Sequence, residues 1–128
     1  MNWKAVPFDT LTSLTLTAVI VDKDIDEIKF IADNGRAFVM RHDQDCCEEV
    51  YIENVAGDIN DLVGSPILIA EEATNDDNID RKLGLGDDGY FTWTFYKLAT
   101  IKGYVDIRWY GTSNGYYSES VDFYETLP

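Results

Sequence analysis

The sequence contains few of the residues that most often carry out chemistry. Among its 128 residues there is one histidine, His42, and there are two cysteines, Cys46 and Cys47, which are neighbours. Adjacent Cα atoms lie about 3.8 Å apart across a trans peptide, which is below the usual range for a disulfide. The sequence therefore predicts no disulfide framework, and it predicts two reduced thiols in a cytosolic compartment.

Long apolar runs are also absent. No stretch approaches the roughly 20 apolar residues that span a bilayer. The first residues, 1–7, lack the apolar centre of a signal peptide. We therefore expect neither a membrane protein nor a secreted one.

Basic residues are scarce. Lys and Arg number 10 against 24 Asp and Glu, so the formal net charge is −14 at pH 7. The imbalance is concentrated between Asp43 and Asp88, where fourteen acidic residues stand against Arg81 and Lys82. Such a field repels nucleic acid and anionic membranes, and it attracts cations or basic protein surfaces. The charge argues against direct binding of nucleic acid and favours a basic partner.

The chain nevertheless has the composition of a folded protein. Hydrophobic residues make up 45% and aromatic residues 13% of it, whereas disordered acidic chains are poor in aromatic residues. A length of 128 residues is sufficient for one domain with its own core. We expect a single domain over residues 1–128, with a long acidic loop around 71–89.

The residue choice favours β-strands, because Val, Ile, Thr and aromatic residues recur with period two. Asp58 would cap a short helical turn over 59–63. The expected strands cover residues 11–21, 26–33, 36–42, 49–55, 67–70, 90–100, 104–111 and 116–124. The predicted fold class is mainly β, with α+β at the margin. An antiparallel sheet of about seven strands with one short helix would form a sandwich or a half-open barrel.

Turn signals predict the register of the first hairpin. Asn34-Gly35 is typical of a two-residue type I′ loop, which places Phe30 opposite Val39. One face would then collect Ile28, Phe30 and Val39.

The last third of the sequence, from Tyr90 onward, predicts a second hairpin. A different segment, residues 67–70, predicts a buried strand. A three-residue loop over 113–115 would pair 104–111 with 116–124 and align Ile107 with Val121. The continuous apolar run over 67–70 favours a central strand buried on both faces.

Four segments of the chain resemble those of a known family. They are residues 42–48 (HDQDCCE), 65–72 (SPILIAEE), 92–100 (TWTFYKLAT) and 107–119 (IRWYGTSNGYYSE). Together they resemble small uncharacterised proteins of tailed bacteriophages and prophages, known as a domain of unknown function, over roughly residues 25–125. The resemblance implies a phage source and a location in the host bacterial cytoplasm. It brings no activity and no catalytic residues.

The cluster of His42, Cys46 and Cys47 is the best candidate for chemistry. With Asp43 or Asp45 it has the donor types of a zinc site, and His42 would be the base for a thiol nucleophile. Adjacent cysteines fit one tetrahedral ion poorly, and the neighbouring carboxylates disfavour a thiolate. We therefore expect a turn with one cysteine packed inward, and we predict no metal, no cofactor and no catalytic residue.

Two further patterns were considered for binding. A calcium loop beginning at Asp76 is rejected, because its sixth position is Arg81 instead of glycine and its twelfth is Asp87. Aromatic side chains form a possible stacking platform, but the basic groove that single-stranded nucleic acid requires is missing. These aromatic residues, which we expect to pack within the fold, are Trp93, Trp109, Tyr110, Tyr116 and Tyr117.

The sequence thus predicts an acidic, non-enzymatic binding protein. It would occupy a basic, nucleic-acid-binding surface of a host protein as a DNA mimic, in the manner of an anti-CRISPR or anti-restriction inhibitor. The candidate partner-binding residues are Asp43, Asp45, Glu48, Glu49, Glu71, Glu72, Asp76 and Asp77. The alternatives are a small thiol- or metal-dependent enzyme or switch at His42, Cys46 and Cys47, and a minor virion or assembly component. The sequence indicates no oligomeric state.

Overall fold

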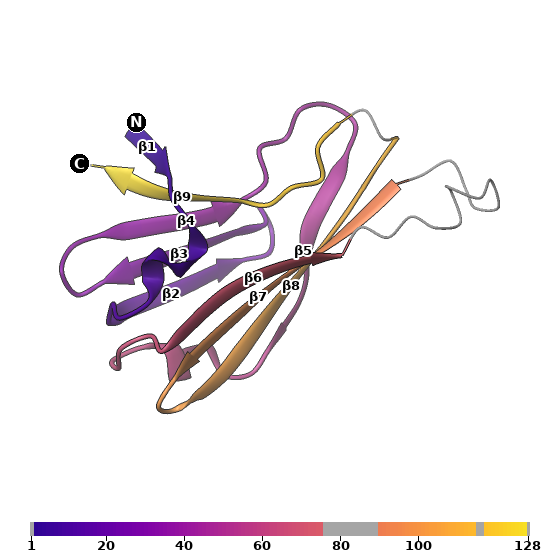
Figure 1. The fold of residues 1–128 in the computed structure, drawn as a ribbon. Helices are drawn as coiled ribbons and strands as arrows, with labels where there is room; N and C mark the ends of the chain where they lie inside the picture. Colours follow the sequence, from indigo (N-terminus) through magenta and orange to yellow (C-terminus); the bar gives the residue numbers. More distant parts are fainter. Residues whose placement is uncertain (1, 76–89, 115–116, 128) are drawn as a thin grey trace.

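Two antiparallel β-sheets form the two layers of the computed structural model (Figure 1). The structure describes residues 2–75, 90–114 and 117–127. Within these ranges there are nine strands, two short 3-10 helices and no closed barrel. The predicted mainly β, antiparallel sandwich is confirmed, with more strands than the seven expected.

The first sheet has five strands and carries both ends of the described chain. β1 pairs with β9, so the N-terminal and C-terminal strands lie side by side (Figure 1). The 3-10 helix η1 (Phe8–Leu11) follows β1. In spatial order the strands are β1 (Asn2–Ala5), β9 (Asp122–Leu127), β4 (Ala37–Arg41), β3 (Glu27–Ala32) and β2 (Leu16–Asp22).

The second sheet has four strands, and its two long central strands form a hairpin. The 3-10 helix η2 (Ile59–Leu62) lies between β5 and β6 in the chain. Its predicted cap is present, because the Asp58 carboxylate accepts a hydrogen bond from the Asn60 N–H at 2.9 Å. In spatial order the strands are β5 (Glu49–Ala56), β8 (Gly103–Ser113), β7 (Tyr90–Thr100) and β6 (Ile69–Asn75).

The core lies between the two sheets and is rich in aromatic side chains. The alternation of β8 buries Val105, Ile107 and Trp109, as the period-two pattern predicts. The Trp109 indole N–H donates to the Met40 sulfur at 3.2 Å, which joins the two layers. Each large side chain that is fully buried contributes roughly 2–3 kcal/mol of transfer free energy.

The predicted register of the first hairpin is wrong by one residue. Phe30 lies opposite Phe38, not Val39. The loop has three residues, because only Gly35 has a positive φ (+89°) and Asn34 instead accepts a hydrogen bond from the Arg36 N–H at 3.0 Å. A shift of one residue exchanges the two faces of a strand. Phe38 therefore enters the core, and Val39 lies on the outer face.

The predicted pairing of β8 with the last strand is also wrong. β8 already has β5 and β7 on its two edges, so no edge remains for β9. After β8 the chain crosses to the five-stranded sheet, where β9 pairs with β4 and β1. Val121 and Phe123 still point into the core, as their alternation predicts. The loop glycine, Gly115, lies outside the described residues.

The apolar run over 67–70 does not form a central strand. It leads into β6, an edge strand, and Leu68 is exposed. β6 continues through Glu71 and Glu72 to Asn75, so the start of the predicted acidic loop is a strand. The remainder, residues 76–89, lies outside the described residues. Both helices in the described ranges are single turns, and none is long and apolar enough to cross a bilayer.

Gly57 and Gly35 provide a matched test of the fold. Both have positive φ, but a Cβ on Gly57 would lie 2.4 Å from the Tyr104 carbonyl oxygen, whereas a Cβ on Gly35 meets nothing within 4 Å. We expect Gly35→Ala to cost about 1 kcal/mol of unfolding free energy, and Gly57→Ala at least about 3 kcal/mol. Urea unfolding measures both. Equal losses would show that β8 does not pack against this turn.

Candidate functional site

The imidazole of His42 connects the two segments that cross between the sheets. Its Nε2 lies 2.7 Å from a Glu48 carboxylate oxygen, and its Nδ1 lies 2.6 Å from the Ser120 carbonyl oxygen. Both side chains of the ion pair are buried. Both of its ring nitrogens therefore face hydrogen-bond acceptors, a carboxylate on one side and a carbonyl on the other.

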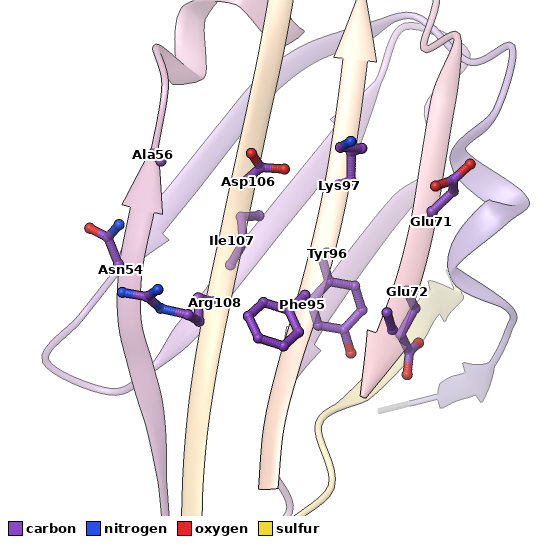
Figure 2. Close-up of a pocket in the computed structure, with 11 residues that line it drawn as sticks. Asn54, Ala56, Glu71, Glu72, Phe95, Tyr96, Lys97, Asp106, Ile107 and Arg108 are labelled. Carbon is purple, nitrogen blue, oxygen red and sulfur yellow. The ribbon is translucent and has the colours of Figure 1, made fainter. Parts of the chain in front are cut away.

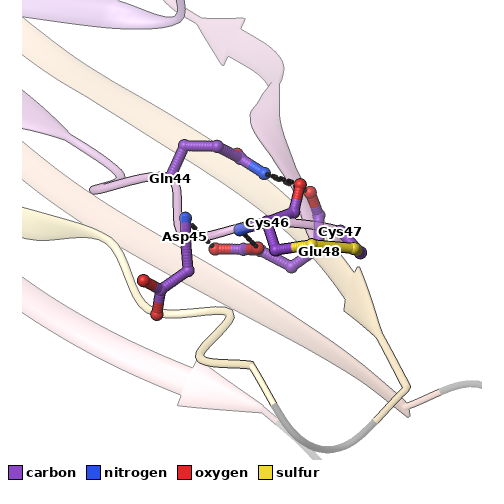
Figure 3. The surroundings of a disulfide bond; sticks show 5 residues. All are labelled: Gln44, Asp45, Cys46, Cys47 and Glu48. Carbon is purple, nitrogen blue, oxygen red and sulfur yellow. Dashed lines mark hydrogen bonds between the residues drawn. A yellow bond between two sulfur atoms is a disulfide. The ribbon is translucent and has the colours of Figure 1, made fainter.

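The loop before β5 wraps around the Glu48 carboxylate (Figure 3). This carboxylate accepts hydrogen bonds from the Asp45 N–H at 2.8 Å and the Cys46 N–H at 3.0 Å. Burial raises the pKa of Glu48, but these N–H groups and His42 outweigh it and lower the pKa to about 2. The Gln44 amide closes the loop by donating to the Glu48 carbonyl at 2.7 Å.

The expectation of two reduced thiols is wrong in this structure. Cys46 and Cys47 form a disulfide with their Cα atoms 3.7 Å apart (Figure 3). The tight turn around the Glu48 carboxylate brings the two sulfurs together, which a reading of chain spacing alone did not anticipate. Both cysteines are exposed, so neither packs inward as predicted.

Three carboxylates from three segments are linked through Asp122, whose charge interacts with each of the other two, and we call them the acidic rim: Asp43, Glu72 and Asp122. The Asp43 N–H lies 3.4 Å from an Asp122 carboxylate oxygen, and the Tyr124 hydroxyl donates to Asp43. This hydrogen bond raises the pKa of Tyr124 to about 12, together with burial.

The charges of the acidic rim act on one another. Burial and the charge of Asp122 raise the pKa of Glu72. Burial raises the pKa of Asp122, and the charge of Asp43 acts in the same direction, while the Asp43 N–H and His42 oppose them. The Arg41 Nε lies 3.9 Å from a carboxylate oxygen of Asp43, so these two side chains form an ion pair. A cluster of ionisable groups with perturbed pKa values is a candidate functional site.

A buried hydroxyl lies beside this rim. Tyr96 is only 1% exposed, and among the described residues its hydroxyl has no hydrogen-bond partner. Burial raises its pKa, and the charges of Glu72 and Asp122 raise it further. Figure 2 shows the Tyr96 ring on β7 next to Glu72 on β6. Burying this hydroxyl without a hydrogen-bond partner among the described residues lowers the free energy of unfolding.

The structure brings together only part of the predicted site. Asp43 and Glu72 lie in the acidic rim, and Asp45 is exposed in the same loop as Asp43. Glu48 is buried against His42 and is not available to a partner. Glu49 is exposed at the start of β5, the edge strand opposite β6.

The remaining predicted residues contribute less to the rim. Glu71 is exposed on the outer face of β6, directly across from Lys97. Asp76 and Asp77 lie outside the described residues. Asp122 was not among the predicted residues, because it lies outside the acidic segment between Asp43 and Asp88. The alternation of Asp122 with the apolar Val121 and Phe123 predicts that the Asp122 side chain points away from the core. It does not predict that the carboxylates of Asp43 and Glu72 lie near it.

The described residues contain no group of three or more His, Cys, Asp or Glu side chains that could hold a metal ion. In the state shown, both nitrogens of His42 are engaged and the two cysteines are joined. His42 therefore has no free nitrogen to act as a base, and neither cysteine is a thiol. The predicted enzyme or switch at these residues stays a prediction.

The fold and the site define a two-sheet β domain with an acidic rim where its sheets are connected. The chain belongs to the DUF7448 family, a domain of unknown function, whose model matches residues 11–123. The match extends over most of the chain and includes His42, Glu48 and all three rim carboxylates. Neither the curated proteins nor the solved structures gave a match.

The low pKa of Glu48 predicts how stability depends on pH. The folded value of about 2 lies below the ordinary value of 4.5, so ionised Glu48 stabilises the fold above pH 4.5. This contribution disappears as the pH falls from 4.5 towards 2. We expect Glu48→Gln to be less stable than the wild type near neutral pH, with a difference that closes on acidification.

Urea unfolding at a series of pH values measures that difference. Glu49→Gln is the control, because Glu49 is the exposed neighbour and its loss should change stability by less than about 0.5 kcal/mol. A difference between wild type and Glu48→Gln that is the same at every pH would contradict the assigned role of the carboxylate.

Proposed function

We propose that this protein is an acidic binding domain that occupies a basic, nucleic-acid-binding surface of another protein. In this proposal the source is a phage, the place of action is the host bacterial cytoplasm, and the partner is a component of host defence. The phage source rests on the sequence resemblance. The carboxylates would take the place of nucleic-acid phosphates on the partner.

The acidic rim is the observation that carries the proposal. Asp43, Glu72 and Asp122 come from separate segments, and placing their charges together raises the free energy of the isolated protein. Lys or Arg side chains of a partner would relieve this repulsion. A surface of like charges is therefore more favourable in a complex with a basic protein than alone.

The scaffold supports this use of the rim. Glu72 and Asp122 are part of strands β6 and β9, and Asp43 is next to His42, whose ring nitrogens are both hydrogen-bonded. Rigid side chains lose less conformational entropy on binding. Asp45 extends the negative surface from the same loop.

Binding to immobilised protein in a bacterial lysate tests the proposal. At about 50 mM salt we expect capture of basic, nucleic-acid-binding proteins, which duplex DNA displaces and about 0.5 M salt releases. The triple variant Asp43→Asn, Glu72→Gln, Asp122→Asn should bind at least about tenfold more weakly, because roughly 1.4 kcal/mol corresponds to a factor of ten.

The control is a triple variant with the same change in net charge at exposed sites on other segments: Asp9→Asn, Asp24→Asn, Asp33→Asn. It should bind within about threefold of the wild type, because its charges lie outside the rim. Equal losses in both variants would show that only net charge matters. Failure to capture any basic protein would remove the support for the proposal.

Removing a rim carboxylate should change the free energy of unfolding and the affinity for the partner in opposite directions. Glu72→Gln removes one of the repelling charges, so it should raise the free energy of unfolding at neutral pH by about 0.5 kcal/mol, the scale of a solvent-screened charge interaction. The same change should weaken partner binding. Urea unfolding gives the first value. A variant that is less stable than the wild type would show that Glu72 makes a favourable contact instead.

A further inference from the structure

The outer face of the four-stranded sheet presents side chains in rows that cross its strands. In one row Tyr51, Tyr110 and Trp93 are directly paired across β5, β8 and β7. Tyr51 and Tyr110 have ring centroids 6.0 Å apart, and Tyr110 and Trp93 have theirs 4.4 Å apart. Outward-facing aromatic residues thus follow one another across three neighbouring strands.

The next row continues this aromatic surface. Phe95 lies one outward position further along β7, with its ring nearly parallel to that of Trp93 at 6.4 Å. It is 39% exposed. Arg108, directly across from Phe95, lies over the Trp93 ring at 5.3 Å and forms an ion pair with Glu53. The Arg108 guanidinium therefore borders the aromatic surface at Trp93.

A hollow of about 500 Å³ adjoins this surface at Phe95, the one ring of the two rows that lines it (Figure 2). It forms where the rows contain small residues, Ala73 across from Phe95 and Ala56 across from Asp106. Figure 2 shows Phe95 at its centre, with Asp106 and Lys97 on the neighbouring positions. An aromatic ring with several polar groups around it is the usual composition of a small-ligand site.

The charges around the hollow alternate in sign, unlike those of the chain as a whole. Glu71, Lys97 and Asp106 are directly paired in one row across β6, β7 and β8. Arg108 adds a donor and Asn54, across from it, adds an amide. Glu72 of the acidic rim also lines the hollow, so three carboxylates and two cations surround it. Because both signs are present, this surface favours neither a polyanion nor a polycation. It offers hydrogen-bond donors and acceptors at spacings of about 5 Å, the distance between neighbouring strands.

We propose that this face binds a neutral saccharide, in an interaction that goes beyond the proposed binding to a basic protein. One face of a sugar ring is apolar C–H surface and would lie on Phe95 and Trp93. The hydroxyl groups at its edge would bond to Lys97, Asp106 and Asn54. Single-stranded nucleic acid also stacks on aromatic rings, but it requires a basic groove, which the mixed charges here do not provide.

A proline-rich peptide is the competing occupant. Such peptides bind between aromatic side chains, with an apolar strip as their main contact. Here the aromatic surface adjoins a row of charged groups, which would remain unpaired against proline rings at a cost in free energy. The hydroxyl groups of a saccharide satisfy them, so the chemistry of the hollow favours the sugar.

A glycan array with the labelled full-length protein, followed by titration with maltohexaose, cellohexaose and chitohexaose, tests the proposal. Titrations use a Trp3→Phe background, so that Trp93 is the partly exposed tryptophan that reports by fluorescence and Trp109 stays buried. We expect binding of at least one neutral saccharide, with a change in Trp93 emission.

Variants locate the site. Measured by isothermal titration calorimetry in the otherwise unchanged protein, Trp93→Ala and Asp106→Ala should each weaken saccharide binding at least about tenfold, whereas Trp3→Ala, the equivalent truncation on the five-stranded sheet, should leave it within about twofold. Because Asp106 is exposed, its variant stays informative even if Trp93→Ala unfolds. No bound glycan on the array, unchanged binding by Asp106→Ala, or binding of a polyproline peptide in place of the saccharide would overturn the proposal. None of these results bears on capture of a basic protein.

Discussion

The structure depends on one buried contact, the ion pair between His42 and Glu48. His42 follows β4, where the chain leaves the five-stranded sheet, and Glu48 immediately precedes β5, the first strand of the other sheet. The second nitrogen of the same ring bonds to Ser120, on the segment by which the chain returns. One imidazole therefore fixes both crossovers, and the backbone amides around Glu48 keep the carboxylate ionised. Removal of either partner would leave an uncompensated charge in a buried position.

The acidic rim follows from this arrangement. Asp43 is next to His42 and Asp122 is two residues after Ser120, so the contact that joins the crossovers also brings these carboxylates together. Glu72 approaches them from β6, beside the Tyr96 hydroxyl, which has no hydrogen-bond partner among the described residues. The favourable ion pair thus supports an unfavourable cluster of like charges. Natural proteins accept such local costs mainly where a partner relieves them. The outer face of the four-stranded sheet differs from the acidic rim, because positive and negative side chains alternate there beside aromatic rings.

The strands and the pairing of β3 with β4 were predictable from the sequence, but the partners of β9 were not. The alternation in β7 and β8 and the cap at Asp58 are local properties, and the structure has both. The position of β9 depends on which sheet edges remain open, which no local pattern contains. The register around Gly35 depended on the φ of one residue, and that choice exchanged the faces of β4. For the same reason Asp43 and Glu72 were predicted as candidates, whereas Asp122, which joins them only through tertiary structure, was not. The disulfide was missed because the turn around Glu48 is not visible in residue spacing.

The most direct test of the account is an NMR titration of the side-chain carboxyl groups in the wild type and in Asp122→Asn. If the rim is assembled as described, the pKa of Glu72 lies above the ordinary value of 4.5 in the wild type and falls in the variant, because burial and the charge of Asp122 raise it. In the same spectra the pKa of Glu48 should be about 2. An ordinary pKa for Glu72 that does not respond to Asp122→Asn would show that these carboxylates do not meet, and the proposed acidic surface would then have no structural basis.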